Sequence, residues 1–296
     1  MNSQQLAGLT SIALGTGIAI GAILGPLVLK IIKFRTSEHL ENQFVGGEVV
    51  SLAVVAPVAI AAGLLWLRGH RLAPALALGL ALYAVYTYTT AVVGQEYARY
   101  DGNVERAFPL YAGLVAGGAA LAAVAWSQLG ATNVPMPSDG LRRTLAGTFL
   151  GIGGLFALTW AAQIRLVMTG NPTAEYHEGP TLFWLIKLLD LGFVIPALMA
   201  TGVGLLGKHP TAVKGAYGLA PFATCLAASV AGMAVVMEVT GDPSADPVLL
   251  AVVLPATAGL AAATVKLLCS YVSGPDEFRP STVNRRSPYR VGAELG

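Results

Sequence analysis

Long apolar runs recur along the whole chain, each about 20 residues or more, with short polar connections between them. A run of that length crosses the hydrocarbon core of a bilayer as an α-helix. A membrane β-barrel would instead show strands of about 10 residues in which polar and apolar positions alternate. The pattern therefore predicts an all-α, polytopic transmembrane bundle of about eight helices. The predicted spans are residues 9–33, 47–67, 73–94, 107–128, 144–168, 182–206, 214–238 and 247–271.

The composition agrees with this pattern, because 55% of the 296 residues are hydrophobic and only 11% are charged. A soluble domain has about 25% charged residues, so a water-soluble globule is excluded. The lipid bilayer is the first expected partner, and no nucleic-acid partner is expected. Since the connections are short, residues 1–273 are predicted to form a single transmembrane domain. Residues 274–296 are polar and are predicted to form a disordered cytoplasmic tail.

Lysine and arginine are distributed unevenly over the connections, and this bias sets the orientation of a membrane protein. With eight helices both termini share one side. That side carries Arg68, Arg71, Arg142, Arg143, Lys208, Lys214, Lys266, Arg279, Arg285, Arg286 and Arg290, against Lys30, Lys33, Arg35, Arg99, Arg106 and Arg165 on the other. We therefore expect a cytoplasmic-membrane protein with both termini in the cytoplasm. The first helix taken alone favours the opposite orientation, because Lys30, Lys33 and Arg35 follow it.

Two charged side chains, Lys187 and Asp190, lie inside the apolar run 182–206. Charged groups at membrane depth face the interior of a bundle or a water-filled cavity and need partners there. Their i, i+3 spacing allows a direct pair. The alternatives are pairing with Glu48 or Arg165 on neighbouring helices, or with a bound ligand. Either a structural salt bridge or a site that binds a substrate or relays a proton fits this pattern.

The predicted outer halves of three helices are polar for segments in lipid. Tyr83 and Tyr86 share a broad helical face, Gln163 and Arg165 end a second span, and the charged pair begins a third. If these faces meet, they form an outward-facing polar cavity. Aromatic residues near the headgroups have a simpler explanation, because tyrosine and tryptophan gather there in most membrane proteins. That explanation covers Tyr97, Tyr100, Tyr111, Trp160, Tyr176 and Trp184, whereas Tyr83 and Tyr86 lie too deep for it.

Two predicted outer loops are rich in potential metal ligands: Glu38, His39, Glu41, Glu175, His177 and Glu178. Their spacing matches no known ligand motif, so solvated loop residues are the better interpretation. Cys225 and Cys269 fall inside apolar runs, where a thiol behaves as a small apolar group. The chain also lacks a Walker A loop, a serine elbow and a paired-histidine zinc motif. No metal site and no catalytic residue is predicted, and no cofactor is indicated.

A weak internal similarity links the second and sixth predicted spans. When Ala56–His70 is written beside Ile195–His209, the matches are Pro57 with Pro196, Gly63 with Gly202, Leu67 with Leu206 and His70 with His209. Both helices are predicted to run inwards, so a four-plus-four parallel repeat is one interpretation. Chance is the other, because short apolar segments match easily. The same alignment pairs Glu48 with Lys187 and Ser51 with Asp190.

Two stretches resemble a group of uncharacterised bacterial multi-pass membrane proteins of about eight helices. One is TLFWLIKLLDLGFVIPALMATGVGLLGKHPTAVKGAYGLAP, with its D-L-G motif followed by proline. The other is the tyrosine-rich ALGLALYAVYTYTTAVVGQEYARYDGNVERAFPLYAGLV. The resemblance covers about a third of the chain. It adds weight to Asp190 and Tyr86 but implies no activity or substrate.

Three functions are compatible with these patterns. The first is the transport or sensing of a small solute or ion, with Lys187 and Asp190 binding or relaying charge while Tyr83, Tyr86 and Gln163 orient the ligand. The second is a structural or assembly subunit of a membrane complex, whose charge pair locks helices together. The third is an intramembrane enzyme that acts on a lipid-borne substrate. The oligomeric state is left open by the sequence.

Overall fold

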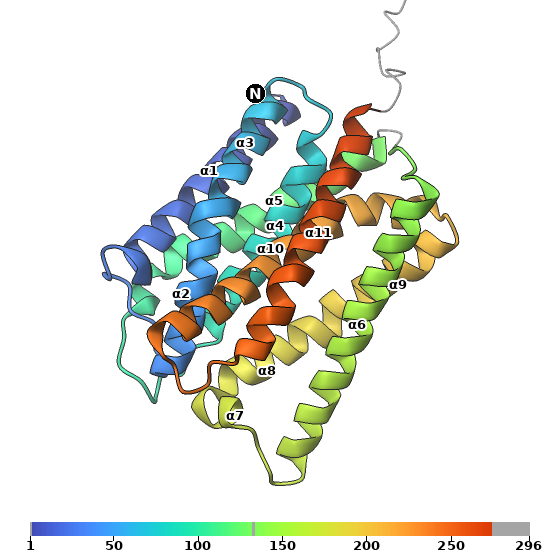
Figure 1. The fold of residues 1–296 in the computed structure, drawn as a ribbon. Coiled ribbons are helices and arrows are strands. Elements are labelled where there is room, and N and C mark those ends of the chain that lie inside the picture. Colours follow the sequence, from blue (N-terminus) through green and yellow to red (C-terminus); the bar gives the residue numbers. More distant parts are fainter. Residues whose placement is uncertain (1, 132–133, 274–296) are drawn as a thin grey trace, which may run out of the picture.

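The computed structural model describes residues 2–131 and 134–273, which form a bundle of helices (Figure 1). Within these residues eight helical spans are long and apolar enough to cross a membrane, which confirms the predicted all-α bundle. The tail predicted at 274–296 lies outside the described residues. The elements are α1 (Ser3–Ala22), η1 (Ile23–Leu27), α2 (Glu38–Val50), η2 (Ser51–Val55), α3 (Ala56–Leu67), α4 (Ala73–Val93), η3 (Val104–Ala107), α5 (Phe108–Ala131), α6 (Asp139–Met168), α7 (Ala174–Glu178), α8 (Pro180–Leu189), η4 (Asp190–Val194), α9 (Ile195–Leu206), α10 (Pro210–Thr240) and α11 (Pro247–Ser273).

Two of the spans consist of three consecutive elements each, because α2, η2 and α3 run on as one helix, and so do α8, η4 and α9. The elements η1, η2 and η4 are π-helical turns, and η3 is a 3₁₀ turn. The start of α1 and the end of α11 lie at the same end of the bundle, and the short helix α7 lies at the opposite end (Figure 1). The latter is called the α7 end below.

The first span lies nearer to the N-terminus than the predicted 9–33, since it runs from Ser3 to Leu27. Its start is capped by the Asn2 side chain, which accepts a hydrogen bond from a backbone amide of the first turn. Its end follows from Gly25, whose ψ of −148° is not helical, and from the proline after it, which has no N–H to donate. The other seven predicted ranges overlap the spans of the structure.

Large apolar side chains cover much of the outside of the bundle. Leu158 is 74% exposed and Val239 is 80% exposed. In water such surfaces would drive aggregation. In hydrocarbon they cost nothing, because lipid chains are as apolar as leucine. This exposure agrees with an integral membrane protein.

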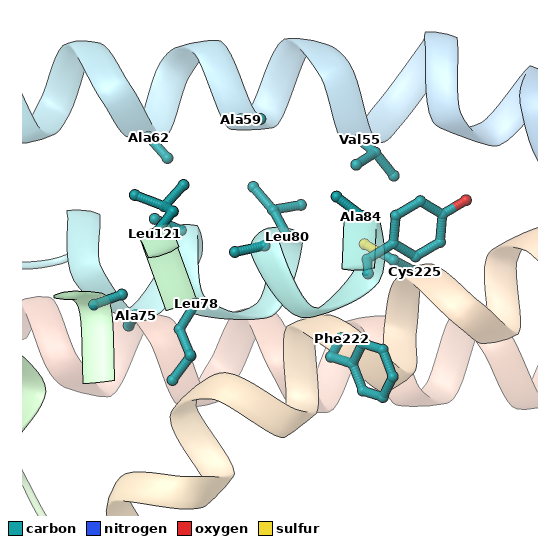
Figure 2. Close-up of a cluster of buried hydrophobic side chains, with 14 of the residues drawn as sticks. Val55, Ala59, Ala62, Ala75, Leu78, Leu80, Ala84, Leu121, Phe222 and Cys225 are labelled. Atoms are coloured by element: carbon teal, nitrogen blue, oxygen red, sulfur yellow. The ribbon is translucent and has the colours of Figure 1, made fainter. Parts of the chain in front are cut away.

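The core of the bundle lies around α4, which is enclosed by α3 on one side and α10 on the other (Figure 2). Val55, Ala59 and Ala62 approach α4 from the first side, while Phe222 and Cys225 belong to α10. Small side chains let the helix backbones come close, which replaces the hydrophobic driving force that is missing in lipid. The tight packing fixes how α4 is turned about its axis, and therefore where its tyrosines lie.

The first four spans and the last four make corresponding contacts. α1 packs against α3 as α6 packs against α9, and α4 packs against α5 as α10 packs against α11. Between the halves, α2 contacts α10 while α8 contacts α4. α4 and α10 also contact each other directly, and a Cβ on Gly79 would lie 2.9 Å from the Gly218 carbonyl oxygen. Exchanging the two halves maps each of these contacts onto another.

Glycines at aligned positions serve the same contact in each half. A Cβ on Gly63 would lie 2.5 Å from the carbonyl oxygen of Gly8, at the α1–α3 contact. A Cβ on Gly202, its partner in the sequence alignment, would lie 3.2 Å from the carbonyl oxygen of Ala146, at the α6–α9 contact. In both places the absence of a side chain allows the helices to approach closely.

Candidate functional site

The charged pair lies where α8 passes into the π turn η4. The turn begins at Asp190, and Pro196 occupies the first turn of α9 after it. The first span of the aligned pair is built in the same way, with η2 beginning at Ser51 and Pro57 following it. A proline inside a helix removes one hydrogen bond and clashes with the carbonyl four residues earlier. A π turn at this point relaxes the clash, and such turns often mark functional sites.

Both oxygens of the Asp190 carboxylate are hydrogen-bonded by side chains from other helices. The Tyr86 hydroxyl of α4 donates to Oδ1 at 2.9 Å, and the Trp160 Nε1–H of α6 donates to Oδ2 at 2.8 Å. All three side chains are partly buried. Hydrogen bonds to an ionised group are stronger than neutral ones, so these contacts hold Asp190 in one position. The carboxylate thereby connects α4, α6 and η4.

Lys187, one turn before Asp190, is nearly inaccessible, with its side chain 2% exposed. Its Nζ lies 3.5 Å from Oε1 of Glu175 in α7. The same ammonium group lies 3.9 Å from the ring centre of Phe183 and 4.0 Å from that of Trp160. Aromatic faces attract cations, more strongly where water is excluded. Trp160 therefore contacts both charges, with its ring face toward Lys187 and its N–H toward Asp190.

We call these five side chains the aspartate cluster: Lys187, Asp190, Tyr86, Trp160 and Glu175. The ion pair of Lys187 is with Glu175. Among the described residues, Lys187 forms no ion pair with Asp190 or Glu48, and Asp190 forms none with Arg165, although the sequence had offered these pairings. Arg165 is exposed near the end of α6. Gln163 lies one turn from Trp160 on the same helix, and its Oε1 is buried without a hydrogen-bond partner among the described residues.

The other predicted site residues, Tyr83 and Glu48, belong to a separate buried cluster. The Tyr83 hydroxyl lies 2.9 Å from Oγ of Ser51 and 2.8 Å from Oγ of Ser229. Glu48 is 3% exposed. The structure therefore divides the predicted residues over two places, because the Tyr83 hydroxyl contacts η2 and α10 whereas the Tyr86 hydroxyl contacts η4.

A cavity of about 830 Å³ opens between α4, α5, α9 and α10. Its lining is mostly apolar and includes Leu78, Trp126 and Thr201. Its lining follows α9 from Ala197, in the first turn, to His209 and Thr211 at the α9–α10 connection, and it does not include Asp190. This cavity is not the polar one that the sequence predicts, which stays a prediction.

The loops at the α7 end form a second, polar cavity of about 420 Å³, which includes His39, Glu178 and Asp242. Asp242 accepts hydrogen bonds from the Asn42 side chain and the Ser244 amide, both at 2.9 Å, and lies 3.1 Å from Nδ1 of His39. Burial raises the pKa of Asp242, but these hydrogen bonds lower it by more, so the pKa lies below its usual value.

Metal ligands do not gather in the part of the chain that the structure describes: no group of three or more His, Cys, Asp or Glu side chains there could hold a metal ion. The loops that begin near Thr36 and Asn171 do meet, since Ser37 Oγ–H donates to the Glu178 carboxylate at 2.7 Å. Of their acidic residues, Glu178 accepts this hydrogen bond and Glu175 pairs with Lys187.

Sequence reasoning missed Glu175 and Trp160 as members of the aspartate cluster. Trp160 resembled an ordinary headgroup aromatic, and Glu175 resembled a solvated loop residue. One signal pointed to Glu175: a buried lysine requires a carboxylate, and α7 is joined to α8 by a single residue, so its carboxylates lie close to the start of α8.

Comparisons with known proteins identify no relative, since no family model, no curated protein and no solved structure matches this chain. The resemblance of its two stretches to uncharacterised bacterial membrane proteins therefore stays an expectation. What the fold supports is an all-α integral membrane protein, with eight candidate spans in the residues that the structure describes.

Proposed function

We propose that this protein binds a small polar solute or ion at the aspartate cluster and transports or senses it. One observation carries the proposal: an acidic and a basic side chain lie within one helical turn inside a membrane span, next to a π turn, and are held by side chains from three other elements. Charges are rare at that depth and mark ligand or ion pathways more often than not.

The cluster offers both kinds of contact that a small solute needs. Asp190 is partly exposed, so a cationic or hydroxyl group can replace Tyr86 or Trp160 as its hydrogen-bond donor. Lys187 offers a positive charge, and the buried Oε1 of Gln163 offers an acceptor without an internal partner among the described residues. Such a set suits a small molecule that carries both a donor and an acceptor group.

The proposal includes a topology. Both termini lie in the cytoplasm, as the distribution of lysine and arginine indicates, so the α7 end faces outwards. We further infer that the two halves are parallel repeats. Three features support this inference at the same alignment offset. They are the matching helix contacts, the π turns that begin at Ser51 and Asp190, and the glycines Gly63 and Gly202. Transporters whose halves are related about the membrane normal place their sites between the halves.

A structural role is the second candidate, and a specific observation favours it. Asp190 and Lys187 both have partners within the chain, which together join α4, α6, α7 and the α8–η4 span. A subunit that only holds a membrane complex together needs no more than that. The two candidates differ in what happens when the charge of Asp190 is removed.

The deciding experiment is Asp190→Asn, with Glu238→Gln as the matched control because Glu238 is exposed at the α7 end of α10. Purified protein is melted in detergent with a panel of amino acids, polyamines and sugars. We expect at least one solute to stabilise the wild type and the control, by about 2.7 kcal/mol at 100 times its Kd. Asp190→Asn should remain folded, with a melting temperature lowered by the loss of its charge-assisted hydrogen bonds, but should lose the response to solute. A large loss of stability in Asp190→Asn, with no solute response in the wild type, would support the structural role instead.

A further inference from the structure

A second polar cluster lies deeper in the bundle, around Glu48. This residue lies in the last turn of α2, just before the π turn η2, and is 3% exposed. Its Oε2 is buried and has no hydrogen-bond partner in the described part of the chain. Glu48 also forms no ion pair there, although an isolated carboxylate at membrane depth is strongly unfavourable. Something other than a protein cation must therefore neutralise it.

Tyrosine hydroxyl groups lie near this carboxyl group, although none forms a hydrogen bond to its Oε2 in the described part of the chain. Glu48 is close enough to Tyr83, Tyr88 and Tyr111 to interact electrostatically with all three. The Tyr88 and Tyr111 rings stack at 5.5 Å, and their hydroxyls are buried with no partner among the residues described. The Tyr83 hydroxyl is already occupied by Ser51 and, from α10, by Ser229.

The arrangement thus combines a carboxyl group with two hydroxyls that have hydrogen bonds left to make. Those hydroxyls come from α4 and α5, and the titratable groups that face Glu48 are these tyrosines and Tyr83. The nearby polar side chain of α10, Ser229, carries no charge. A protonated carboxyl group has one O–H to donate and still accepts, so a proton removes the charge without any change of packing.

We propose that Glu48 is a proton-binding site inside the membrane, with Tyr88 and Tyr111 as its hydrogen-bonding shell. Binding converts the carboxylate and one proton from water into a neutral carboxylic acid, and release reverses this step. Release requires water to reach the cluster, and the π turn η2 beside Glu48 is the element that can rearrange to admit it.

The position of the site connects it to the aspartate cluster. In the alignment of the two spans, Glu48 corresponds to Lys187, and each lies one turn before a π turn. α4 contributes Tyr86 to the aspartate cluster and Tyr83 and Tyr88 to the Glu48 cluster, so it contacts both. This inference deepens the proposed function by making the proton the coupling ion, and it depends on that function only for the coupling. Proton binding itself stands on the Glu48 cluster.

Infrared spectroscopy of purified protein in lipid vesicles tests the site directly. At neutral pH we expect a C=O stretching band of a neutral carboxylic acid that shifts in D₂O. Glu48→Gln should remove the band, and Asp190→Asn should leave it unchanged. Tyr88→Phe should move its frequency, which reports on the hydrogen-bonding shell even if Glu48→Gln folds poorly.

Two outcomes would overturn the assignment. If the wild type shows no such band, or if Glu48→Gln retains it, then Glu48 is not the protonated group. If addition of Na⁺ at constant pH abolishes the band, the site binds sodium rather than a proton. The two proposals can fail separately. If no solute stabilises the protein but the infrared band is present and Glu48→Gln removes it, only the proposed solute site is excluded. If the band is absent but a solute stabilises the wild type and not Asp190→Asn, only the proposed proton site is excluded.

Discussion

At the scale of single residues, Trp160 connects the two charges of the aspartate cluster. Its ring face contacts the Lys187 ammonium group and its N–H donates to Asp190, so one side chain stabilises opposite charges. Aromatic rings are suited to this position because the face is negative and the indole N–H is a donor. The charges of Lys187 and Asp190 are thereby satisfied without touching each other.

Replacing Trp160 by phenylalanine should separate these two contacts. The ring over Lys187 remains, whereas one oxygen of Asp190 loses its donor, so we expect a loss of about 1.5–3 kcal/mol in the free energy of unfolding. Trp184→Phe is the control, because Trp184 is 42% exposed, and it should change stability by less than about 0.5 kcal/mol. Denaturation in detergent micelles measures the free energy of unfolding of both variants. Equal effects of the two substitutions would show that the hydrogen bond to Asp190 contributes nothing.

At the scale of helices, close approach depends on particular glycines rather than on glycine content. The α2–α10 contact illustrates this with two neighbouring residues. A Cβ on Gly46 would lie 2.4 Å from Cα of Met233, in the backbone of α10, whereas a Cβ on Gly47 would meet only the flexible end of the Met233 side chain at 3.5 Å. Because Glu48 follows directly, this contact also helps to bury the proton-binding site.

Alanine substitutions at these two positions should therefore change the stability of the protein by different amounts, or in opposite directions. We expect Gly46→Ala to destabilise the protein by about 1–3 kcal/mol, since the helices must move apart. Gly47→Ala should be neutral or stabilise by up to about 1 kcal/mol, because alanine favours the helix and meets open space or a movable side chain. The two variants are compared by their melting temperatures in detergent. Similar melting temperatures for the two variants would contradict the close α2–α10 packing.

At the scale of the whole molecule, loops at the α7 end join the two halves. Asp242, after α10, accepts hydrogen bonds from Asn42 in α2 and pairs with His39, while Ser37 bonds Glu178 of α7. These contacts close the bundle at the end where the candidate solute site lies. The apolar cavity, which is lined by α4, α5, α9 and α10, also lies between helices of both halves.

The lowered pKa of Asp242 makes this closure dependent on pH. A carboxylate whose pKa is lowered by folding stabilises the protein fully when the pH is above the ordinary pKa of about 3.9. This stabilisation is lost as the pH falls through the lower pKa of the folded state. We expect Asp242→Asn to cost about 1 kcal/mol at neutral pH, with Glu41→Gln, exposed on the same helix α2, as a neutral control. Thermal melting across pH should show wild type and Asp242→Asn converging in acid. A difference that is constant with pH would exclude this role for the charge.

What the sequence alone determined is the class of the protein and the register of its spans. Runs of about 20 apolar residues can satisfy their backbone in lipid only as helices, so the eight spans followed from local composition. The same reasoning identified Lys187 and Asp190 as charges that require partners. The alignment also paired Ser51 with Asp190, and the structure has a π turn that begins at each of them.

The partners themselves were decided by the tertiary structure. Which side chains meet depends on how each helix is turned about its axis, and in an apolar bundle that rotation is set by packing of small residues over the whole length. Tyr83 and Tyr86 are three residues apart, yet one faces Ser51 and Ser229 while the other faces Asp190. No local pattern distinguishes the two, since the difference depends on which neighbouring helix lies on each side of α4.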